Sequence, residues 1–174
     1  QLPLEAVHPA YDLLAIRPPA GLKARITGLA YLGDGRLLLS SWDDLNSVLS
    51  ATGTESDSWQ NVRTRTFAYG LQEPMGLALS EGQLYIAQKQ ELTRLVDNTG
   101  QFNAVNEYWT VCSHWPYSGN FGEYASGLIS KDGALYTSLS MPLEITGRTL
   151  QPQQKGRGTV IRVDPEKGEY ETAA

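Results

Sequence analysis

The chain has 174 residues, a net charge of −5 and 41% hydrophobic residues, which is enough apolar material for a folded domain with a sizeable core. No apolar run approaches the roughly 20 residues of a membrane span, and no basic cluster favours nucleic acid or anionic lipid as a partner. The single cysteine, Cys112, excludes an internal disulfide, and the C-x-x-C-H signal for covalent haem is absent.

Short strands recur along nearly the whole chain. Residues 1–23 are predicted to be an N-terminal tether with one strand at 11–16, which Pro18 and Pro19 end because proline lacks a ladder donor. Twelve further strands are predicted at 28–32, 36–39, 47–51, 63–69, 75–79, 83–87, 92–96, 107–112, 124–129, 134–139, 159–163 and 169–172. Helical periodicity is absent throughout, so the sequence predicts an all-β fold.

A repeat organises these strands. Gly-Leu pairs start at positions 28, 76 and 127, and each is followed by a glycine-containing turn and a second strand. In the third copy the turn is Asp132-Gly133, the strongest short-range hairpin signal, because the tight turn needs positive φ. A period near 50 residues made of short strands is typical of a β-propeller. We therefore predict three four-stranded blades, at 24–73, 74–123 and 124–174, with the strand at 11–16 as the outer strand of a preceding blade.

Three blades raise a problem, because propellers close a ring of typically 4–8 blades and an unclosed ring exposes apolar faces. Three explanations compete. The chain is a fragment of a longer protein, or it is half of a six-bladed ring that closes as a homodimer, or its three sheets pack as a sandwich or prism. The sequence leaves all three open.

Two segments at and after the boundary between the first and second repeats resemble a known family. They read AYGLQEPMGL at 68–77 and QLYIAQK at 83–89, and residues 91–95 and 157–163 extend the likeness. This wording is similar to that of the glucose/sorbosone dehydrogenase-like propellers, and closest to their branch of predicted membrane-bound dehydrogenases and large multi-domain proteins. The resemblance covers about residues 24–174.

The resemblance implies a six-bladed propeller, often one module of a longer exported protein. The best-understood relatives oxidise sugars with pyrroloquinoline quinone (PQQ) and calcium, and their general base is a histidine ten residues before the Asp of the first hairpin turn. Counting back from Asp132 leads to Gly122, which has no side chain to accept a proton. This departure argues against quinoprotein catalysis.

A second departure concerns calcium. The close branch carries a D-x-D-G-D-G loop after the third strand of a blade, whereas this chain has DNTGQFN at 97–103. Only Asp97 keeps its charge, and Phe102 replaces a glycine. Because calcium needs several oxygen ligands, a tight site is not expected here, and no residue is predicted to bind a metal.

The loops that join blades and the loops after each second strand should share one face of a propeller. On that face we expect a set of polar and aromatic side chains: Trp42, Asp43, Glu73, Lys89, His114, Trp115, Tyr117, Asn120, Glu123 and Arg157. Aromatic planes beside carboxylates and amides suit sugar recognition. The alternative is that the aromatics fill gaps between blades and the charges are solvated.

Several members of this set have competing interpretations. His114 could replace the missing base, or it could be an exposed loop histidine. Lys89 could bind a cofactor carboxylate, although pairing with nearby Glu91 is favoured, and Glu73 could bind a ligand or accept backbone N–H groups. Cys112 is expected to be a buried small hydrophobe, and Asp43 is expected to cap a turn.

The function favoured by the sequence is a non-catalytic module of an exported multi-domain protein, either a scaffold or a binder of carbohydrate or another small ligand. The rival is a PQQ-dependent sugar or alcohol oxidoreductase that uses His114 as its base. A third class is a pure protein–protein scaffold, for which the incomplete ring is the only support. Export is expected from the family resemblance alone.

Overall fold

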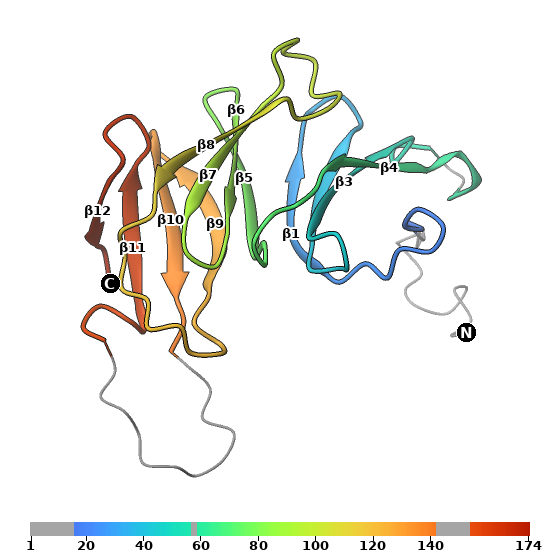
Figure 1. Cartoon of the computed structure of the whole chain (residues 1–174). Helices are drawn as coiled ribbons and strands as arrows, with labels where there is room; N and C mark the ends of the chain where they lie inside the picture. The colour runs from blue at the N-terminus through green and yellow to red at the C-terminus, as the bar shows by residue number, and fades with distance from the viewer. Residues whose placement is uncertain (1–15, 57–58, 142–153) are drawn as a thin grey trace, which may run out of the picture.

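A computed structural model describes residues 16–56, 59–141 and 154–174. These residues form three four-stranded antiparallel sheets, each built from four strands consecutive in the sequence. The sheets stand side by side and do not close into a ring (Figure 1). The predicted all-β fold with propeller-like four-stranded blades is confirmed.

Within each sheet, strands that are consecutive in the sequence are neighbours. The first sheet contains β1 (Ile26–Tyr31), β2 (Leu37–Ser41), β3 (Ser47–Thr52) and β4 (Arg63–Ala68), with a 3-10 turn at Trp59–Asn61 before β4. The second contains β5 (Gly76–Ser80), β6 (Gln83–Ala87), β7 (Leu92–Val96) and β8 (Glu107–Cys112). The third contains β9 (Ala125–Lys131), β10 (Ala134–Leu139), β11 (Thr159–Asp164) and β12 (Glu169–Thr172).

All twelve strands predicted after residue 23 are present, with ends shifted by at most two residues. The hairpin turns explain this agreement. Glu81 and Asp132 have φ of 48° and 51°, and the glycine after each also has positive φ, as a tight two-residue hairpin requires. Of the lone strand expected at 11–16, only Ile16 lies within the described residues. Most of the long insertion before β11 also lies outside them.

The first strand of each sheet is the inner one, and β5 lies between β1 and β9 (Figure 1). Glycine permits this approach. A Cβ added to Gly28 would lie 2.8 Å from the backbone nitrogen of Leu77, and one added to Gly76 would lie 2.6 Å from the carbonyl carbon of Gly127. The repeated Gly-Leu pair therefore marks where neighbouring inner strands meet.

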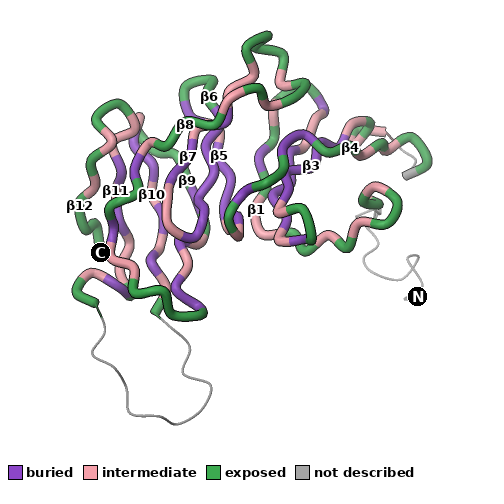
Figure 2. The backbone as a smooth tube through the Cα atoms, in the orientation of Figure 1, coloured by how far each residue is buried: buried purple, intermediate pink, exposed green. Residues whose placement is uncertain are grey.

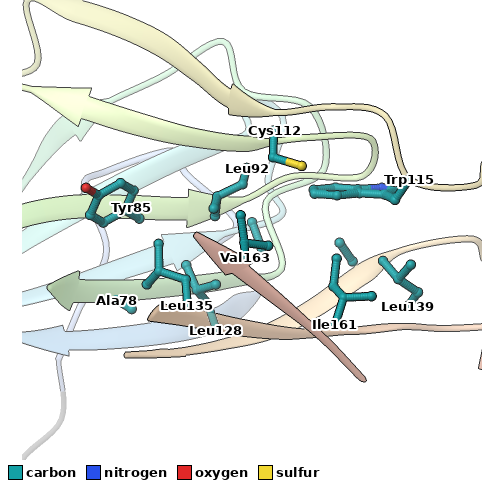
Figure 3. Packing of buried hydrophobic residues seen from close by; sticks show 12 residues of the cluster. Ala78, Tyr85, Leu92, Cys112, Trp115, Leu128, Leu135, Leu139, Ile161 and Val163 are labelled. Carbon is teal, nitrogen blue, oxygen red and sulfur yellow. The ribbon is translucent and has the colours of Figure 1, made fainter. Parts of the chain in front are cut away.

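Two apolar cores fill the spaces between the sheets, and burial is concentrated on the strands facing them (Figure 2). Leu38, Val48, Leu84 and Ile86 belong to the core between the first and second sheets. Between the second and third sheets lies a larger cluster (Figure 3): Ala78, Tyr85, Ala87, Leu92, Cys112, Trp115, Ala125, Leu128, Leu135, Leu139, Ile161 and Val163. Cys112 is buried there, as expected of a small hydrophobe.

Among the described residues, no helix is long and apolar enough to cross a membrane.

Candidate functional site

The loops at one end of the three sheets meet, as the propeller topology predicts (lower edge of Figure 1). The backbone N–H of Gly70 donates to the carbonyl of Leu45 at 2.9 Å, so the loop between the first two sheets contacts the β2–β3 turn. The N–H of Lys89 donates to the carbonyl of Gln72 at 3.0 Å, so the same loop also contacts the β6–β7 turn. Side chains from different blades are thereby brought to one place.

An ion pair lies within these loops. The ammonium of Lys89, just after β6, is 2.6 Å from Oε2 of Glu73, just before β5, and both side chains are largely buried. The expected pairing of Lys89 with Glu91 is wrong. Oε1 of Glu91 accepts a hydrogen bond from Gln88 Nε2 at 3.0 Å and Oε2 accepts one from Thr110 at 3.2 Å. The backbone bond from Lys89 to Gln72 instead brings its side chain beside Glu73.

Two aromatic rings, Phe121 and Tyr124, lie beside this ion pair, and a third, Trp42, packs against Tyr124. We call Trp42, Phe121 and Tyr124 the aromatic cluster. The ring centroid of Tyr124 is 5.9 Å from that of Trp42 and 6.5 Å from that of Phe121. The Lys89 ammonium lies 5.0 Å from the Tyr124 centroid and 5.9 Å from that of Phe121, within the range of cation–π attraction. Residues from all three blades therefore build one aromatic and charged surface.

The electrostatics of this surface favour its charged state. Burial alone would lower the pKa of Lys89, but the hydrogen bond and negative charge of Glu73 outweigh that cost and raise it. Burial and the charge of Glu73 raise the pKa of the Tyr124 phenol, with Lys89 opposing. At neutral pH the Lys89 ammonium and the Tyr124 phenol therefore both keep their protons.

A buried polar cluster supports the loop that carries Phe121 and Tyr124. The carboxylate of Glu123 is 1% exposed and accepts hydrogen bonds from the N–H of Ser118 at 2.7 Å and from its hydroxyl at 2.8 Å. The Arg157 guanidinium donates to the carbonyls of Tyr124 at 3.0 Å and Pro116 at 3.3 Å. Burial lowers the pKa of Arg157, while the charge of Glu123 opposes that shift. Glu123 and Arg157 therefore stabilise this loop from its buried side.

The remaining predicted residues are placed elsewhere. His114 is exposed, and its ring contacts the sulfur of Cys112 and lies 5.2 Å from the ring of Tyr170, so its neighbours come from the outer strands β8 and β12. Trp115 is 3% exposed within the core between the second and third sheets, so its ring cannot stack on a ligand at the surface (Figure 3). Asn120 is exposed on the loop that Glu123 supports.

Asp43 and Tyr117 complete the set. The carboxylate of Asp43 is buried and accepts hydrogen bonds from the Leu45 N–H at 2.8 Å and the Ser47 hydroxyl at 2.6 Å, so it caps the β2–β3 turn as expected. Tyr117 is half-buried and close enough to raise the pKa of Lys89 and of Arg157 electrostatically.

The described residues do not fit the quinone and calcium implied by the family resemblance. Gly122, at the position of the family base, is buried and offers only its carbonyl, which accepts a hydrogen bond from Ser140 Oγ at 2.7 Å. The Asp97 carboxylate accepts the backbone N–H groups of Thr99 at 2.7 Å and Asn103 at 2.6 Å. No group of three or more His, Cys, Asp or Glu side chains within the described ranges could hold a metal ion.

Sequence reasoning missed Phe121 and Tyr124. Both lie in the loop that contains the predicted Trp115 and Tyr117, so the available signal was the density of aromatic residues between 115 and 124. Which of these rings would be buried depends on the packing of the third sheet against the second.

No family model and no curated protein sequence matches the chain. Among solved structures it is similar to a predicted oxidoreductase (glucose dehydrogenase) of Thermus thermophilus, with a TM-score of 0.58 and 20% identity over 86% of this chain. It is also similar to a chain of a nidogen/laminin complex, with a TM-score of 0.54 and 14% identity over 87% of this chain. At these identities the likeness shows the fold alone. The chain spans 45% and 48% of those two chains, about half of each.

Proposed function

We propose that the chain is part of a propeller module that binds carbohydrate, or a similar ligand with several hydroxyls, without catalysing its reaction. The observation that carries the proposal is the aromatic cluster beside the Lys89–Glu73 ion pair, where Phe121 and Tyr124 lie next to the ammonium and Trp42 packs on Tyr124. The rings would stack on the C–H faces of a sugar, and charged and amide groups would pair with its hydroxyls. Among these groups, Phe121 and Asn120 are exposed and accessible to a ligand.

The absence of a base at position 122 favours binding over catalysis. The rival function, a PQQ-dependent oxidoreductase, needs His114 to act as base, and the neighbours of His114 are Cys112 and Tyr170 of the outer strands. The ion pair and aromatic cluster instead join the inner parts of three blades. Export within a multi-domain protein is part of the proposal, and secretion of a reporter fused to the natural full-length protein tests it.

The test is a titration of the chain with a panel of mono- and oligosaccharides that includes glucose. Heteronuclear NMR and calorimetry detect binding. We expect at least one sugar to shift the Lys89, Phe121 and Tyr124 resonances. Because Phe121 is 57% exposed, Phe121→Ala should fold normally and weaken that binding by about three- to tenfold, the value of one stacking contact.

Trp109→Ala is the matched control, because Trp109 is 51% exposed on the outer strand β8 and lies outside the aromatic cluster. Equal effects of the two substitutions, or no response to any sugar, would contradict the proposal. Sugar-dependent dye reduction after addition of PQQ and calcium, abolished by His114→Ala, would establish the rival function instead.

A further inference from the structure

The second sheet carries a cross-strand row of residues on the face that the third sheet covers. Ala78 on β5 is paired with Tyr85 on β6, Tyr85 with Arg94 on β7, and Arg94 with Trp109 on β8. Tyr85 is only 3% exposed because the third sheet packs over it. The β11–β12 turn reaches the same junction, since a Cβ on Gly168 would lie 2.5 Å from the carbonyl oxygen of Val111.

The third sheet repeats this row on its own outward face. Ile129 on β9 is paired with Tyr136 on β10, Tyr136 with Arg162 on β11, and Arg162 with Glu171 on β12. Tyrosine and arginine occupy the same two central strands in both rows. The inner-strand residues of the two rows differ in exposure: Ile129 is 62% exposed, whereas its counterpart Ala78 is 7% exposed.

The repeated glycines indicate that the outward face of the third sheet could also accept a neighbouring inner strand. Gly28 meets the backbone of β5, and Gly76 meets that of β9. Gly127 is the next member of this series, and a Cβ added to it would have no described atom within 4 Å. We call Gly127, Ile129, Tyr136 and Arg162 the ladder face. Like the face of the second sheet that the third sheet covers, it combines a glycine on the inner strand with a Tyr–Arg pair on the central strands. The charge of Arg162 is paired with Glu171 at 3.3 Å.

The opposite end of the row of sheets presents the complementary half of such a junction. Leu29, Leu39 and Leu49 are paired across β1, β2 and β3 on the face turned away from the second sheet. In the second sheet the corresponding strand carries Leu77, which is 3% exposed, whereas Leu29 is 59% exposed.

A groove of about 410 Å³ with predominantly apolar walls follows this surface. Ile16, Leu22 and Ala24 cover its outer part, which leaves Leu29 and Ile26 uncovered on the inner strand. We call Ile26, Leu29, Leu39 and Leu49 the leucine face.

We propose that the ladder face of one copy of this chain binds the leucine face of a second copy. Both halves of one inter-blade junction lie on the same chain, so a second copy presents to each face the surface that matches it. Two identical junctions related by a twofold axis close a ring of six sheets, and this symmetry leaves no free face.

In this assembly β1 of the second copy lies against Gly127 as β9 lies against Gly76. Leu29 takes the place at the new junction that Leu128 takes between the second and third sheets, where it is 7% exposed. The aromatic cluster and its ion pair would then occur twice around one central axis.

The test is the solution mass of the 174-residue chain by light scattering over a wide range of concentrations. We expect a species of twice the 19.1 kDa chain mass that dissociates on dilution. Ile129→Lys and Leu29→Glu should each weaken association by about a hundredfold or more, because each would bury an unpaired charge. Both positions are exposed in the single chain, so its fold should be retained, which circular dichroism checks.

The double variant Ile129→Lys/Leu29→Glu provides the decisive comparison. Each junction would then place one lysine against one glutamate, so we expect the dimer to be restored in large part. Leu45→Lys is the control, because Leu45 is 49% exposed in the β2–β3 turn and belongs to neither face. A monomer at every concentration, a dimer that both single substitutions leave intact, or an open polymer would each overturn the proposal.

Discussion

The ammonium of Lys89 and the carboxylate of Glu73 are 2.6 Å apart and join the end of β6 to the start of β5. Neither group belongs to a strand, so the pair is held by loop contacts, chiefly the backbone bond from Lys89 to Gln72. Glu73 has a φ of 46°, a left-handed conformation uncommon outside glycine. The loop geometry therefore places the two charges together, and the ammonium lies beside the rings of Phe121 and Tyr124.

Lys89→Met should destabilise the chain by about 1–3 kcal/mol, because the Glu73 carboxylate would be left largely buried without its partner. Glu73→Gln in the Lys89→Met background should recover part of this loss. Denaturant unfolding of the single and double variants measures the coupling energy. A double variant whose loss equals the sum of the two single losses would show that the pair contributes nothing.

The glycine at the inner strand predicts a second effect. Gly76→Ala should cost about 3 kcal/mol, at the upper end of overpacking, because the new methyl would meet the backbone of β9. Thermal and denaturant unfolding measure this cost.

Gly127→Ala is the comparison. In the single chain, its Cβ meets no described atom, but its φ of 68° makes alanine cost about 1–2 kcal/mol, so both variants are compared at concentrations where the chain is monomeric. A Gly76→Ala variant as stable as the parent chain would contradict the close approach of β5 and β9.

The sequence predicts the strands well because their determinants are local. Alternating apolar residues and turns such as Asp132-Gly133 specify a hairpin without reference to the rest of the chain. Position 76 requires glycine because strand β9 lies too close for a Cβ. In the sequence this requirement is visible only because the Gly-Leu pair is repeated. Repetition made this long-range requirement detectable.

The site is less predictable because its contacts link distant segments. The topology predicts which loops share one end, but it does not give the partner of Lys89, which depends on the bond to Gln72. Likewise, Trp115 and Glu123 look like exposed loop residues in sequence. They are buried because the third sheet and Arg157 close over them.

Arg157 predicts a third effect. Arg157→Ala removes the hydrogen bonds to Pro116 and Tyr124 and leaves the buried Glu123 carboxylate without its nearby positive charge, so it should cost about 3 kcal/mol. Arg157→Lys keeps the charge and should lose less. The NMR signals of Phe121 should shift in both variants.

Arg65→Ala is the control for this experiment, because Arg65 is exposed and its guanidinium donates a hydrogen bond to Asn103 at 3.2 Å on the surface. Its loss should be well under 1 kcal/mol. If Arg157→Ala is no more damaging than Arg65→Ala, the loop that carries Phe121 and Tyr124 does not depend on Arg157.

The Asp97 loop predicts the behaviour of stability in acid. Partial burial would raise the pKa of Asp97, but the hydrogen bonds from Thr99 and Asn103 outweigh it and lower the pKa below its ordinary value of 3.8. A carboxyl with a lowered pKa stabilises the fold above that ordinary value, and this contribution is lost as pH falls through the folded-state pKa. Asp97→Asn should therefore lower the unfolding free energy by about 1 kcal/mol at pH 7. The difference from the parent chain should shrink steadily below about pH 4.

Denaturant unfolding at a series of pH values measures this difference. Asp44→Asn is the control, because Asp44 is an exposed carboxylate in the β2–β3 turn. A difference that persists unchanged to about pH 2 would mean that the charge of Asp97 does not stabilise its loop.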